Sequence, residues 1–432
     1  MKGLLFTFGM TYGGALASFF NPYYGFLVYV CFGVLRPTAM WWYSVPEGNY
    51  SRIIAIAFIA SWLLHGLGNW QLGRAKAPMI ALGAFLAMNV ISMLLAPQRE
   101  IAWSFVETLA KVVIPMAMGV TLINSFVRLN QLVWVVVLSQ GFVAYEMNMT
   151  YFSGYNRFYY DGFAGLDNNG VALTLVAGAG IAFFLALYET NWLRKAVASL
   201  VFLLMTHGVM FSFSRGGLLA LIGVGIAAFY VLPKRPLYFA VLIAAALIGY
   251  RLAGEEVLER FATVFADKSE RDESADSRLA LWRACYDEMA RNPLVGVGPD
   301  HFRLVAHNHG FMANKAAHST WMQTGAEIGV MGLASLLAFY GLILWRLQSV
   351  MKAKTESGKP TELAQVAQMA FSSLVGFGIA AQFVSVNLVE IPFYVAAIGM
   401  GTLVLASQPV SASEADLEYY DAYESNLSRV YV

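Results

Sequence analysis

Long apolar segments follow one another along this chain, and short polar connections separate them. Most of them approach the roughly 20 residues that a helix needs to cross a bilayer core of ~30 Å. They cover about 3–20, 22–35, 51–70, 77–96, 102–124, 129–150, 169–188, 195–213, 216–232, 236–252, 320–346, 366–388 and 391–407. The pattern predicts an all-α, polytopic integral membrane protein.

The composition agrees with this prediction. Of 432 residues, 58% are hydrophobic and only 13% are charged, whereas a soluble domain carries roughly 25% charged residues. The net charge of +1 gives no sign of a nucleic-acid surface. Cys31 and Cys285 lie in very different contexts and indicate no disulfide framework. The first apolar run could be a signal peptide, but a second follows at once and favours an uncleaved anchor.

Lysine and arginine are concentrated in alternate connections, which sets the orientation. Cytoplasmic loops are enriched in these residues. We therefore expect a cytoplasmic set of connections, which holds Arg74, Lys76, Arg128, Arg194, Lys195, Lys234, Arg235, Arg346, Lys352, Lys354 and Lys359. The outward set is 36–52, 97–100, 151–168, the Ser214-Arg215 turn and 253–319. Thirteen crossings with a cytoplasmic C-terminus would place Lys2 outside. A broken pair of half-helices over 3–35, crossing only once, would instead give twelve spans with both ends inside.

The chain divides into four regions by these criteria. They are an N-terminal transmembrane bundle over 1–252, an outward loop over 253–319, C-terminal transmembrane helices over 320–407 and a polar, mobile cytoplasmic tail over 408–432. The loop should hold two amphipathic helices. One covers Glu255 to Phe265, and the other begins at an N-cap, Asp276 or Ser277, and ends near Pro293.

The second loop helix carries a candidate binding face. Arg278, Trp282, Cys285 and Met289 follow at helical spacing on one stripe. An aromatic and methionine face that begins with an arginine suits a helix lying on the bilayer surface. The alternative is a helix that simply packs on the bundle. Arg283, on another face, is expected to be solvated.

Arg215 is a candidate anion-binding residue. It lies in the sequence S-R-G-G between two apolar segments. Its guanidinium offers paired donors to a phosphate, and the two glycines let a backbone or ligand approach closely. The alternative is an ordinary boundary arginine that reaches toward water.

Histidines concentrate just before residue 320. His318 precedes an apolar segment and has polar neighbours, Gln323 among them. An imidazole with a pKa near 6.5 can take a proton from an alcohol at neutral pH, although a capping histidine would look the same. His301, His307 and His309 raise the possibility of a metal site. Neither H-E-x-x-H nor a zinc-type Cys/His spacing is present, so we expect no metal.

Other polar residues are candidates for contact with substrate. Glu107 and Lys111 form an i,i+4 pair inside an apolar segment, where charges mark function or a buried structural pair. Arg157 and the run Asp167-Asn168-Asn169, in an outward connection, could contact sugars. No internal repeat is visible, which argues against a repeat-built transporter or flippase.

Several of these motifs together resemble the O-antigen ligase/polymerase superfamily. They are S-R-G-G at Ser214–Gly217, S-R-L-x-L-W from Ser277, N-P-L-x-G-x-G-P from Asn292, and A-H-S-T-W-x-Q-x-x-x-E-x-G from Ala317. D-N-N-G at Asp167–Gly170 and W-x-x-x-E-x-x-x-K at Trp103–Lys111 are similar to the O-glycosylation-ligase-like branch, which includes ligases of the O-antigen type.

The resemblance implies a fold and an activity. The fold is a bundle of about twelve transmembrane helices with a large periplasmic loop, in the bacterial inner membrane. The activity is transfer of a glycan from undecaprenyl diphosphate to the lipid A-core, without a metal or other cofactor. Arg215 and Arg278 match the family's essential arginines, and His318 matches its essential histidine.

The expected site combines these three catalytic residues with six that bind substrate. Those six are Lys111, Arg157, Asn168, Trp282, His309 and Gln323. The expected partners are the lipid-linked glycan donor, the lipid A-core acceptor and membrane lipids. An O-antigen polymerase or a protein O-oligosaccharyltransferase would share this chemistry and differ only in the acceptor.

Overall fold

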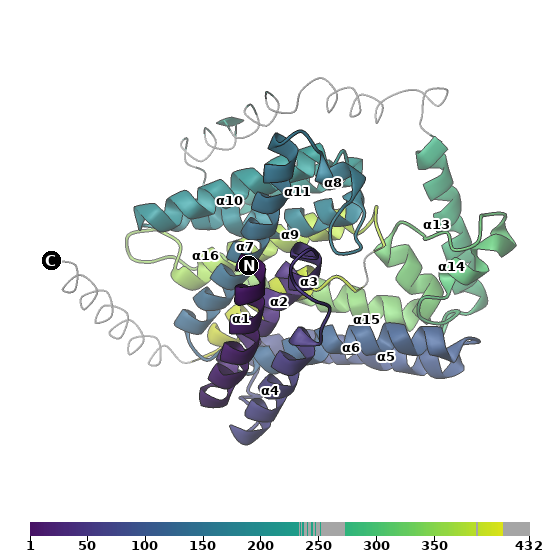
Figure 1. The fold of residues 1–432 in the computed structure, drawn as a ribbon, viewed down its shortest axis with the longest axis horizontal. Coiled ribbons are helices and arrows are strands. Elements are labelled where there is room, and N and C mark those ends of the chain that lie inside the picture. Colours follow the sequence, from purple (N-terminus) through teal and green to yellow (C-terminus); the bar gives the residue numbers. More distant parts are fainter. Residues whose placement is uncertain are drawn as a thin grey trace.

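A computed structural model describes residues 1–232, 273–385 and 388–408, with scattered positions between 234 and 251. The described chain is helical (Figure 1), which confirms the all-α prediction. The α-helices are α1 Lys2–Phe20, α2 Pro22–Leu35, α3 Pro37–Met40, α4 Tyr50–Leu64, α5 Lys76–Leu95, α6 Arg99–Val120, α7 Phe126–Phe152, α8 Arg157–Tyr160, α9 Asn168–Tyr188, α10 Trp192–Phe211, α11 Arg215–Val231, α13 Glu273–Arg291, α14 Phe302–Val305, α15 Thr320–Val350, α16 Glu362–Ala380 and α17 Ile391–Leu405. Two 3-10 helices are η1 Gly73–Ala75 and η2 Ala306–His309.

Many of these helices match the expected spans. Eight described helices are long and apolar enough to cross a membrane: α1, η1 with α5, α6, α7, α9, α10, α15 and α16. Helices α4, α11 and α17 are apolar but shorter. The protein is therefore a polytopic membrane protein. Helix α16 ends at Ala380, well before the expected residue 388. Most of the expected 236–252 span lies outside the described residues.

The chain reverses direction between α1 and α2, which corrects one expectation. A Cβ on Gly14 would lie 2.8 Å from Val28, and one on Gly25 would lie 2.3 Å from Ser18. Contacts of this order require antiparallel helices, whereas half-helices that together cross the membrane once would continue in one direction. The turn occurs at Asn21, whose side chain caps α2. The hypothesis of a single broken crossing is therefore wrong.

The outward and cytoplasmic sets of connections gather at opposite ends of the bundle. Hydrogen bonds join members of the outward set: Arg36 to Ala164, Gln98 to His301, and Asn168 to Ser212. Other hydrogen bonds join members of the cytoplasmic set: Arg74 to Ser407, and Arg346 to the backbone of Arg74. The lysine and arginine pattern thus separated the two ends correctly. Gly3 packs on Trp41, so the N-terminus lies at the outward end.

Helices α9 and α17 form the centre of the bundle. Every residue from Gly170 to Leu185 is buried, as is every residue of α17. Helix α9 packs on α7, α10, α11 and α16. Its glycines let neighbours approach closely, since a Cβ on Gly180 would lie 2.5 Å from the Ser373 hydroxyl. Small residues serve this purpose in membrane helices, where apolar burial does not drive association.

An outward subdomain packs on the first part of α15 (Figure 1). It consists of α13, α14 and η2, with a small core that includes Leu281, Cys285 and Phe302. Helix α13 begins at Glu273, a turn earlier than expected, and ends at Arg291. A Cβ on Gly325 of α15 would meet Met289 at 2.7 Å. The second loop helix therefore packs on the bundle.

Parts of the expected outward loop and the tail are not described. The amphipathic helix expected over Glu255 to Phe265 lies outside the described residues, and so does the tail from 409 onward. Helix α15 is interrupted at Gly329, where φ is +76°. There the Val330 N–H donates to the Pro293 carbonyl at 2.8 Å, so the break ties α15 to the turn after α13.

Candidate functional site

Two motifs that are far apart in the sequence form one structure at the outward end. The Asn168 side chain donates to the Ser212 carbonyl at 2.9 Å. The Ser214 hydroxyl donates to the Asn169 side chain at 2.7 Å. These bonds fix the beginning of α9 against the turn that leads to Arg215. Asn168 is thus placed among the site residues, holding the turn rather than reaching into open space.

Arg215 is the first residue of α11 and lies next to a contact between this helix and Phe383. A Cβ on Gly216 would lie 2.6 Å from the Phe383 Cβ, so only glycine allows this approach. The Phe383 ring also lies 6.3 Å from the Trp282 ring on α13. Phe383 therefore connects the Arg215 turn to the helix that carries Arg278, one turn before Trp282. Both arginines are half-buried.

His318 lies in a tight turn directly before α15. Its φ is +52°, a left-handed conformation that costs of order 1–3 kcal/mol for a residue other than glycine. The turn is held on both sides: the Ser319 N–H donates to the Ser385 hydroxyl at 3.2 Å, and the Thr320 N–H donates to the Ala381 carbonyl at 2.8 Å. Backbone strain of this kind concentrates at functional sites.

The electrostatic surroundings of His318 connect it to other elements. Burial lowers the pKa of His318 below its ordinary value of 6.5, and the charges of Arg278 and Lys315 lower it further. The Asp167 carboxylate acts in the opposite direction. The ring is therefore neutral at pH 7 and can accept a proton. Lys315 is a cation of this site that the sequence analysis missed.

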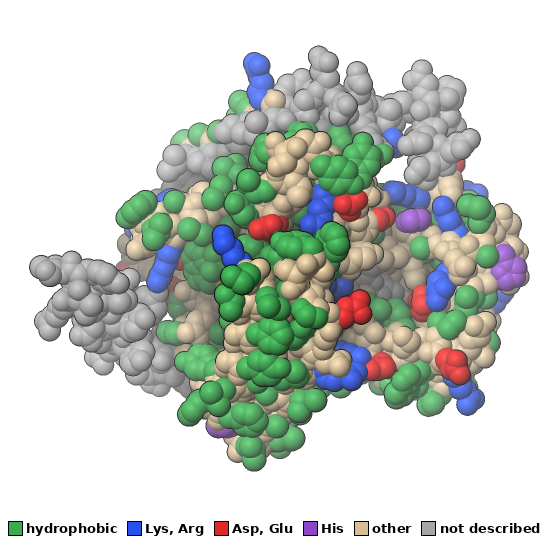
Figure 2. Space-filling model, in the orientation of Figure 1, with side chains coloured by type: hydrophobic (Ala, Val, Ile, Leu, Met, Phe, Trp, Pro, Cys, Tyr) green, Lys and Arg blue, Asp and Glu red, His purple; other side chains and the backbone are tan. Residues whose placement is uncertain are grey.

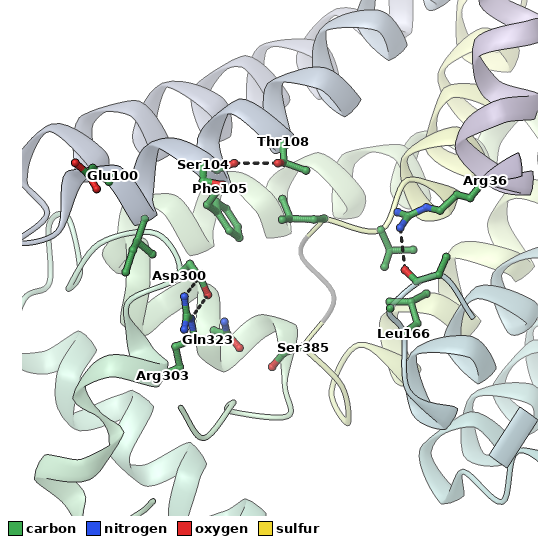
Figure 3. Close-up of a pocket in the computed structure, with 15 residues that line it drawn as sticks. Arg36, Glu100, Ser104, Phe105, Thr108, Leu166, Asp300, Arg303, Gln323 and Ser385 are labelled. Atoms are coloured by element: carbon green, nitrogen blue, oxygen red, sulfur yellow. Dashed lines mark hydrogen bonds and ion pairs between the residues drawn. The ribbon is translucent and has the colours of Figure 1, made fainter. Parts of the chain in front are cut away.

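A polar cavity adjoins these residues. It has a volume of about 580 Å³, within the range of small-molecule sites. Its polar lining comes from Arg36, Glu100, Ser104, Thr108, Asp300, Arg303, Gln323 and Ser385 (Figure 3). Acidic and basic side chains surround the hollow on this face, whereas hydrophobic side chains cover the side of α1 and α4 (Figure 2). The three expected catalytic residues do not line the cavity themselves. Its wall includes Ser385, which holds the His318 turn, and Leu166, next to Asp167.

Two ion pairs at the cavity were not predicted from the sequence. Arg36 donates to Glu390 at 2.7 Å, and these residues are 354 positions apart in the chain. On the opposite wall, Arg303 donates to both oxygens of Asp300 at 3.0 and 2.9 Å (Figure 3). Arg36 and Ala164 also line a second cavity of about 370 Å³. The spacing of Asp300 and Arg303 was the only signal for either pair in the sequence.

One of the expected substrate-binding residues lines the cavity, and a second lies on a helix that does. Gln323 lines it, and its amide donates to Glu327 at 3.0 Å. Lys111 pairs with Glu107 at 2.6 Å, and both side chains are exposed. On α6, Lys111 shares a face with Ser104 and Thr108, which line the cavity, so the polar stripe continues along this helix.

The other expected contact residues do not line the cavity. The Arg157 guanidinium lies 6.0 Å from the centre of the Phe163 ring. The buried indole N–H of Trp282 has no hydrogen-bond partner among the described residues. His309 is mostly buried and contacts Glu288 at 2.7 Å inside the outward subdomain, away from the residues that line the cavity. Arg283 is exposed, as expected.

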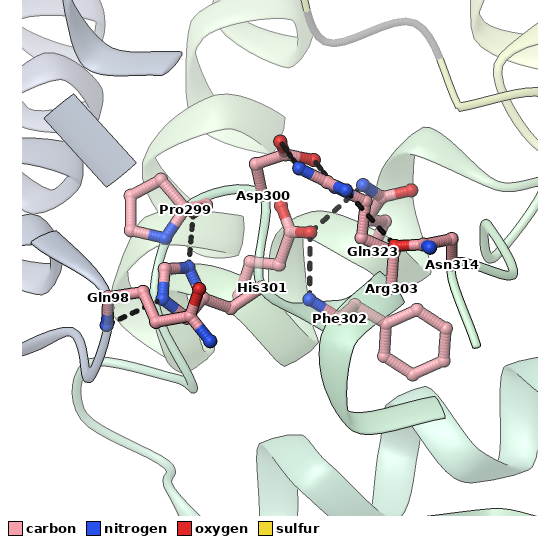
Figure 4. Close-up of polar contacts among 9 residues, drawn as sticks. Gln98, Pro299, Asp300, His301, Phe302, Arg303, Asn314 and Gln323 are labelled. Atoms are coloured by element: carbon pink, nitrogen blue, oxygen red, sulfur yellow. Dashed lines mark hydrogen bonds and ion pairs between the residues drawn. The ribbon is translucent and has the colours of Figure 1, made fainter. Parts of the chain in front are cut away.

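His301 is a structural residue of the same region. It is 2% exposed, and both ring nitrogens are bonded (Figure 4). Nδ1–H donates to the Pro299 carbonyl at 2.7 Å, and Nε2 accepts from the Gln98 N–H at 3.1 Å. It thereby joins the outward subdomain to the connection between α5 and α6. Within the described part of the chain, no three His, Cys, Asp or Glu side chains form a cluster that could hold a metal.

Comparison with known families places the site in context. Residues 200–337 match the Wzy_C family model, described as O-antigen ligase, and this segment contains Arg215, Arg278 and His318. Residues 1–158 match a family of unknown function (DUF5935). No curated protein matches the chain. Over residues 200–337 this multi-pass protein is therefore similar to the O-antigen ligase domain of the O-antigen ligase/polymerase superfamily, whose members transfer lipid-linked glycans.

Proposed function

We propose that the protein is an O-antigen ligase. It moves a glycan en bloc from undecaprenyl diphosphate to a hydroxyl of the lipid A-core oligosaccharide. The transfer occurs at the periplasmic face of the bacterial inner membrane, which corresponds to the outward end of the bundle. The observation that carries this proposal is the half-buried, strained His318 near Arg278 and Lys315 and beside a polar cavity, inside an O-antigen ligase domain.

His318 is the general base in this proposal. Its imidazole takes the proton of the acceptor hydroxyl as the oxygen attacks the anomeric carbon. The bond from that carbon to the diphosphate oxygen breaks, and the electron pair leaves with the lipid diphosphate. Direct attack of this kind inverts the anomeric configuration. General base catalysis typically contributes ~10²–10⁴ in rate.

Arg215 and Arg278 stabilise the leaving group. Negative charge builds on the diphosphate as it departs, and planar guanidinium groups match phosphate oxygens with paired donors. Preorganised donors of this kind are worth ~10²–10³ in rate each. Lys315 lies close enough to His318 to add positive charge at the same place. In this proposal the cations replace a divalent metal, so the reaction needs no cofactor.

The remaining expected residues serve the two glycans. Gln323 and Lys111 contact sugars in or beside the cavity, while Asn168, Arg157 and Trp282 shape the wall near the diphosphate. His309 is buried against Glu288, so its contact with the glycans is the least direct. About twelve helices, with the 253–319 loop outside, would leave the lipid chains of both substrates in the bilayer.

A lipopolysaccharide gel from a host that lacks this gene tests the proposal. The host is run with empty vector, with the wild-type gene and with His318→Ala. We expect core-only lipid A and accumulated lipid-linked polymer in the deletion, corrected by the wild type alone. Lipid A capped by a single repeat unit would identify a polymerase. A normal ladder in the deletion would contradict the lipid A-core as acceptor and turn attention to a protein acceptor or to transport.

A further inference from the structure

Asp300 and Arg303 form a well-ordered ion pair although both side chains are partly exposed. Both side chains are about one-third exposed, at 33% and 36%, and both line the cavity. Ion pairs with this exposure contribute little to stability. The pair nevertheless has a bidentate geometry, with bonds of 3.0 and 2.9 Å (Figure 4). Its arrangement therefore calls for a role other than holding the fold.

The backbone beneath Asp300 is strained and anchored. Asp300 has a φ of +57°, and Gly298, two positions earlier, has a φ of +113°. The Gly298 N–H donates to the Glu327 carbonyl at 2.9 Å, which ties the turn to α15. His301, next in the chain, is fixed through both ring nitrogens to the neighbouring backbone. A non-glycine residue keeps such a conformation only where its surroundings impose it, and such positions cluster at ligand clamps.

Side chains from α15 and from the loop that precedes it complete the support. The buried Glu327 carboxylate accepts from the Phe302 N–H at 3.2 Å and from the Gln323 amide at 3.0 Å. These bonds hold the start of α14, from which Arg303 projects. The Arg303 Nη1 also donates to the Asn314 side chain at 3.2 Å. Arg303 is therefore fixed at three N–H groups before any ligand arrives.

The donors and acceptors that remain define a ligand. A guanidinium has five N–H donors and a carboxylate about four acceptor positions. The bonds to Asp300 and Asn314 use three donors of Arg303, and the ion pair uses two acceptor positions of Asp300. Among the described residues, the pair thus keeps two N–H donors and two acceptor positions. Two adjacent hydroxyl groups, each able to donate and accept, complement this set.

The other charges of the cavity favour an uncharged ligand. Arg36 lies on the opposite wall (Figure 3) and is neutralised by Glu390 at 2.7 Å. Glu100 also lines the cavity and would repel an anion. The cations near His318 lie apart from this lining, so the cavity and the proposed diphosphate site differ in charge. A neutral saccharide fits the cavity better than an acidic one.

We infer that Asp300 and Arg303 form a clamp for a vicinal diol of an uncharged sugar. The inference rests on the proposed function only in naming the two possible sources of that sugar, which are the donor glycan and the acceptor oligosaccharide. Both present the same hydroxyl chemistry, and binding measurements distinguish them.

Titration calorimetry on the protein in lipid nanodiscs tests the clamp without any transfer step. The probes are the oligosaccharide released from lipid A-core by mild acid and the glycan released from the lipid-linked donor. Each is used intact and after periodate oxidation, which cleaves vicinal diols. The variants are Asp300→Asn, because asparagine tolerates the left-handed conformation, and Arg303→Gln. The matched controls are Asp287→Asn and Arg283→Gln, which change exposed residues of α13.

One probe should bind the wild type about tenfold or more tightly than it binds either variant, as expected when hydrogen bonds to charged groups are lost. Both controls should match the wild type, and periodate should abolish binding of that probe. The probe affected identifies donor or acceptor as the source. Equal affinity in variants and controls would overturn the clamp, and so would no saturable binding of either probe.

A milder variant distinguishes loss of binding from misfolding. Asn314→Ala removes only the third support of Arg303 and should weaken binding a few-fold, with an unchanged thermal midpoint. Wild-type affinity in this variant, together with unfolding of the other two, would mean that the pair is structural. The experiment measures binding and not transfer. Its result can therefore be interpreted even if the proposed ligase activity is absent.

Discussion

At the scale of single residues, His318 is the group on which the proposed chemistry depends. Sequence reasoning identified the residue but not its surroundings, because Asp167 and Arg278 come from segments distant in the chain. Its left-handed backbone, at φ +52°, is also invisible in the sequence. Neighbouring charges of opposite sign act on its pKa in opposite directions. This balance makes the protonation of His318 testable by substitution of its neighbours.

Activity should fall in acid as His318 becomes protonated. Because the pKa of His318 is lowered from 6.5, the acid limb of kcat/KM should lie below pH 6.5. Lys315→Gln removes a charge that lowers this pKa, so the limb should move to higher pH. Asp167→Asn removes a charge that raises it, so the limb should move lower, and asparagine still caps α9. The position of the limb is measured from rate profiles of purified wild type and both variants between about pH 4.5 and 8. Limbs that coincide would exclude His318 as the titrating base.

At the scale of elements, the site depends on how closely helices and loops approach one another. The start of α11 touches the loop between α16 and α17 at Gly216. This contact brings the Arg215 turn toward α13 through Phe383. Further along α11, Gly225 has open space around its Cβ position. The helix therefore offers a matched pair of substitutions, one at the contact and one away from it.

Gly216→Ala should damage the site, whereas Gly225→Ala should not. The added methyl would lie 2.6 Å from the Phe383 Cβ, and overpacking of this kind costs about 1–3 kcal/mol. We expect a lower thermal midpoint and reduced transfer for Gly216→Ala. Alanine at 225 should be neutral or slightly stabilising, since glycine weakens a helix. Equal midpoints and rates for the two variants would show that the contact with Phe383 does not matter.

At the scale of the whole molecule, the hydropathy pattern predicted most helices but not their packing. Apolar runs gave the bounds of α5, α9 and α15 to within a few residues at their starts because membrane helices must be continuously apolar. The pattern could not show that α1 and α2 form a hairpin. Asn21-Pro22 breaks a helix whether the chain continues or reverses, and only the packing of Gly14 on Val28 distinguishes the two.

For the candidate site, the sequence predicted residues in local motifs but not contacts between distant segments. Motifs supplied Arg215, Arg278 and His318 because each motif is local. The ion pair of Arg36 with Glu390 joins residues too distant for any local signal. Other histidines of this region have structural contacts: His301 is fixed through both ring nitrogens, and His309 contacts Glu288. Composition cannot separate such structural histidines from a catalytic one.

The hairpin places the N-terminus at the outward end, and cysteine labelling can test this. Both native cysteines are first replaced by serine. Lys2→Cys should then react with a membrane-impermeant maleimide added to spheroplasts. Ser357→Cys, exposed in the connection between α15 and α16, should react only after permeabilisation. Protection of Lys2→Cys in intact spheroplasts would contradict the orientation of α1.

The most direct test of the central claim is a transfer assay with purified protein in liposomes. Lipid-linked glycan and lipid A-core are supplied together, and the rate of ligated product is compared among wild type, His318→Ala and His307→Ala. His307 is exposed and serves as the control. We predict that His318→Ala is slower by ~10²–10⁴ and that His307→Ala keeps the wild-type rate. Transfer by His318→Ala at the wild-type rate would contradict the proposed mechanism.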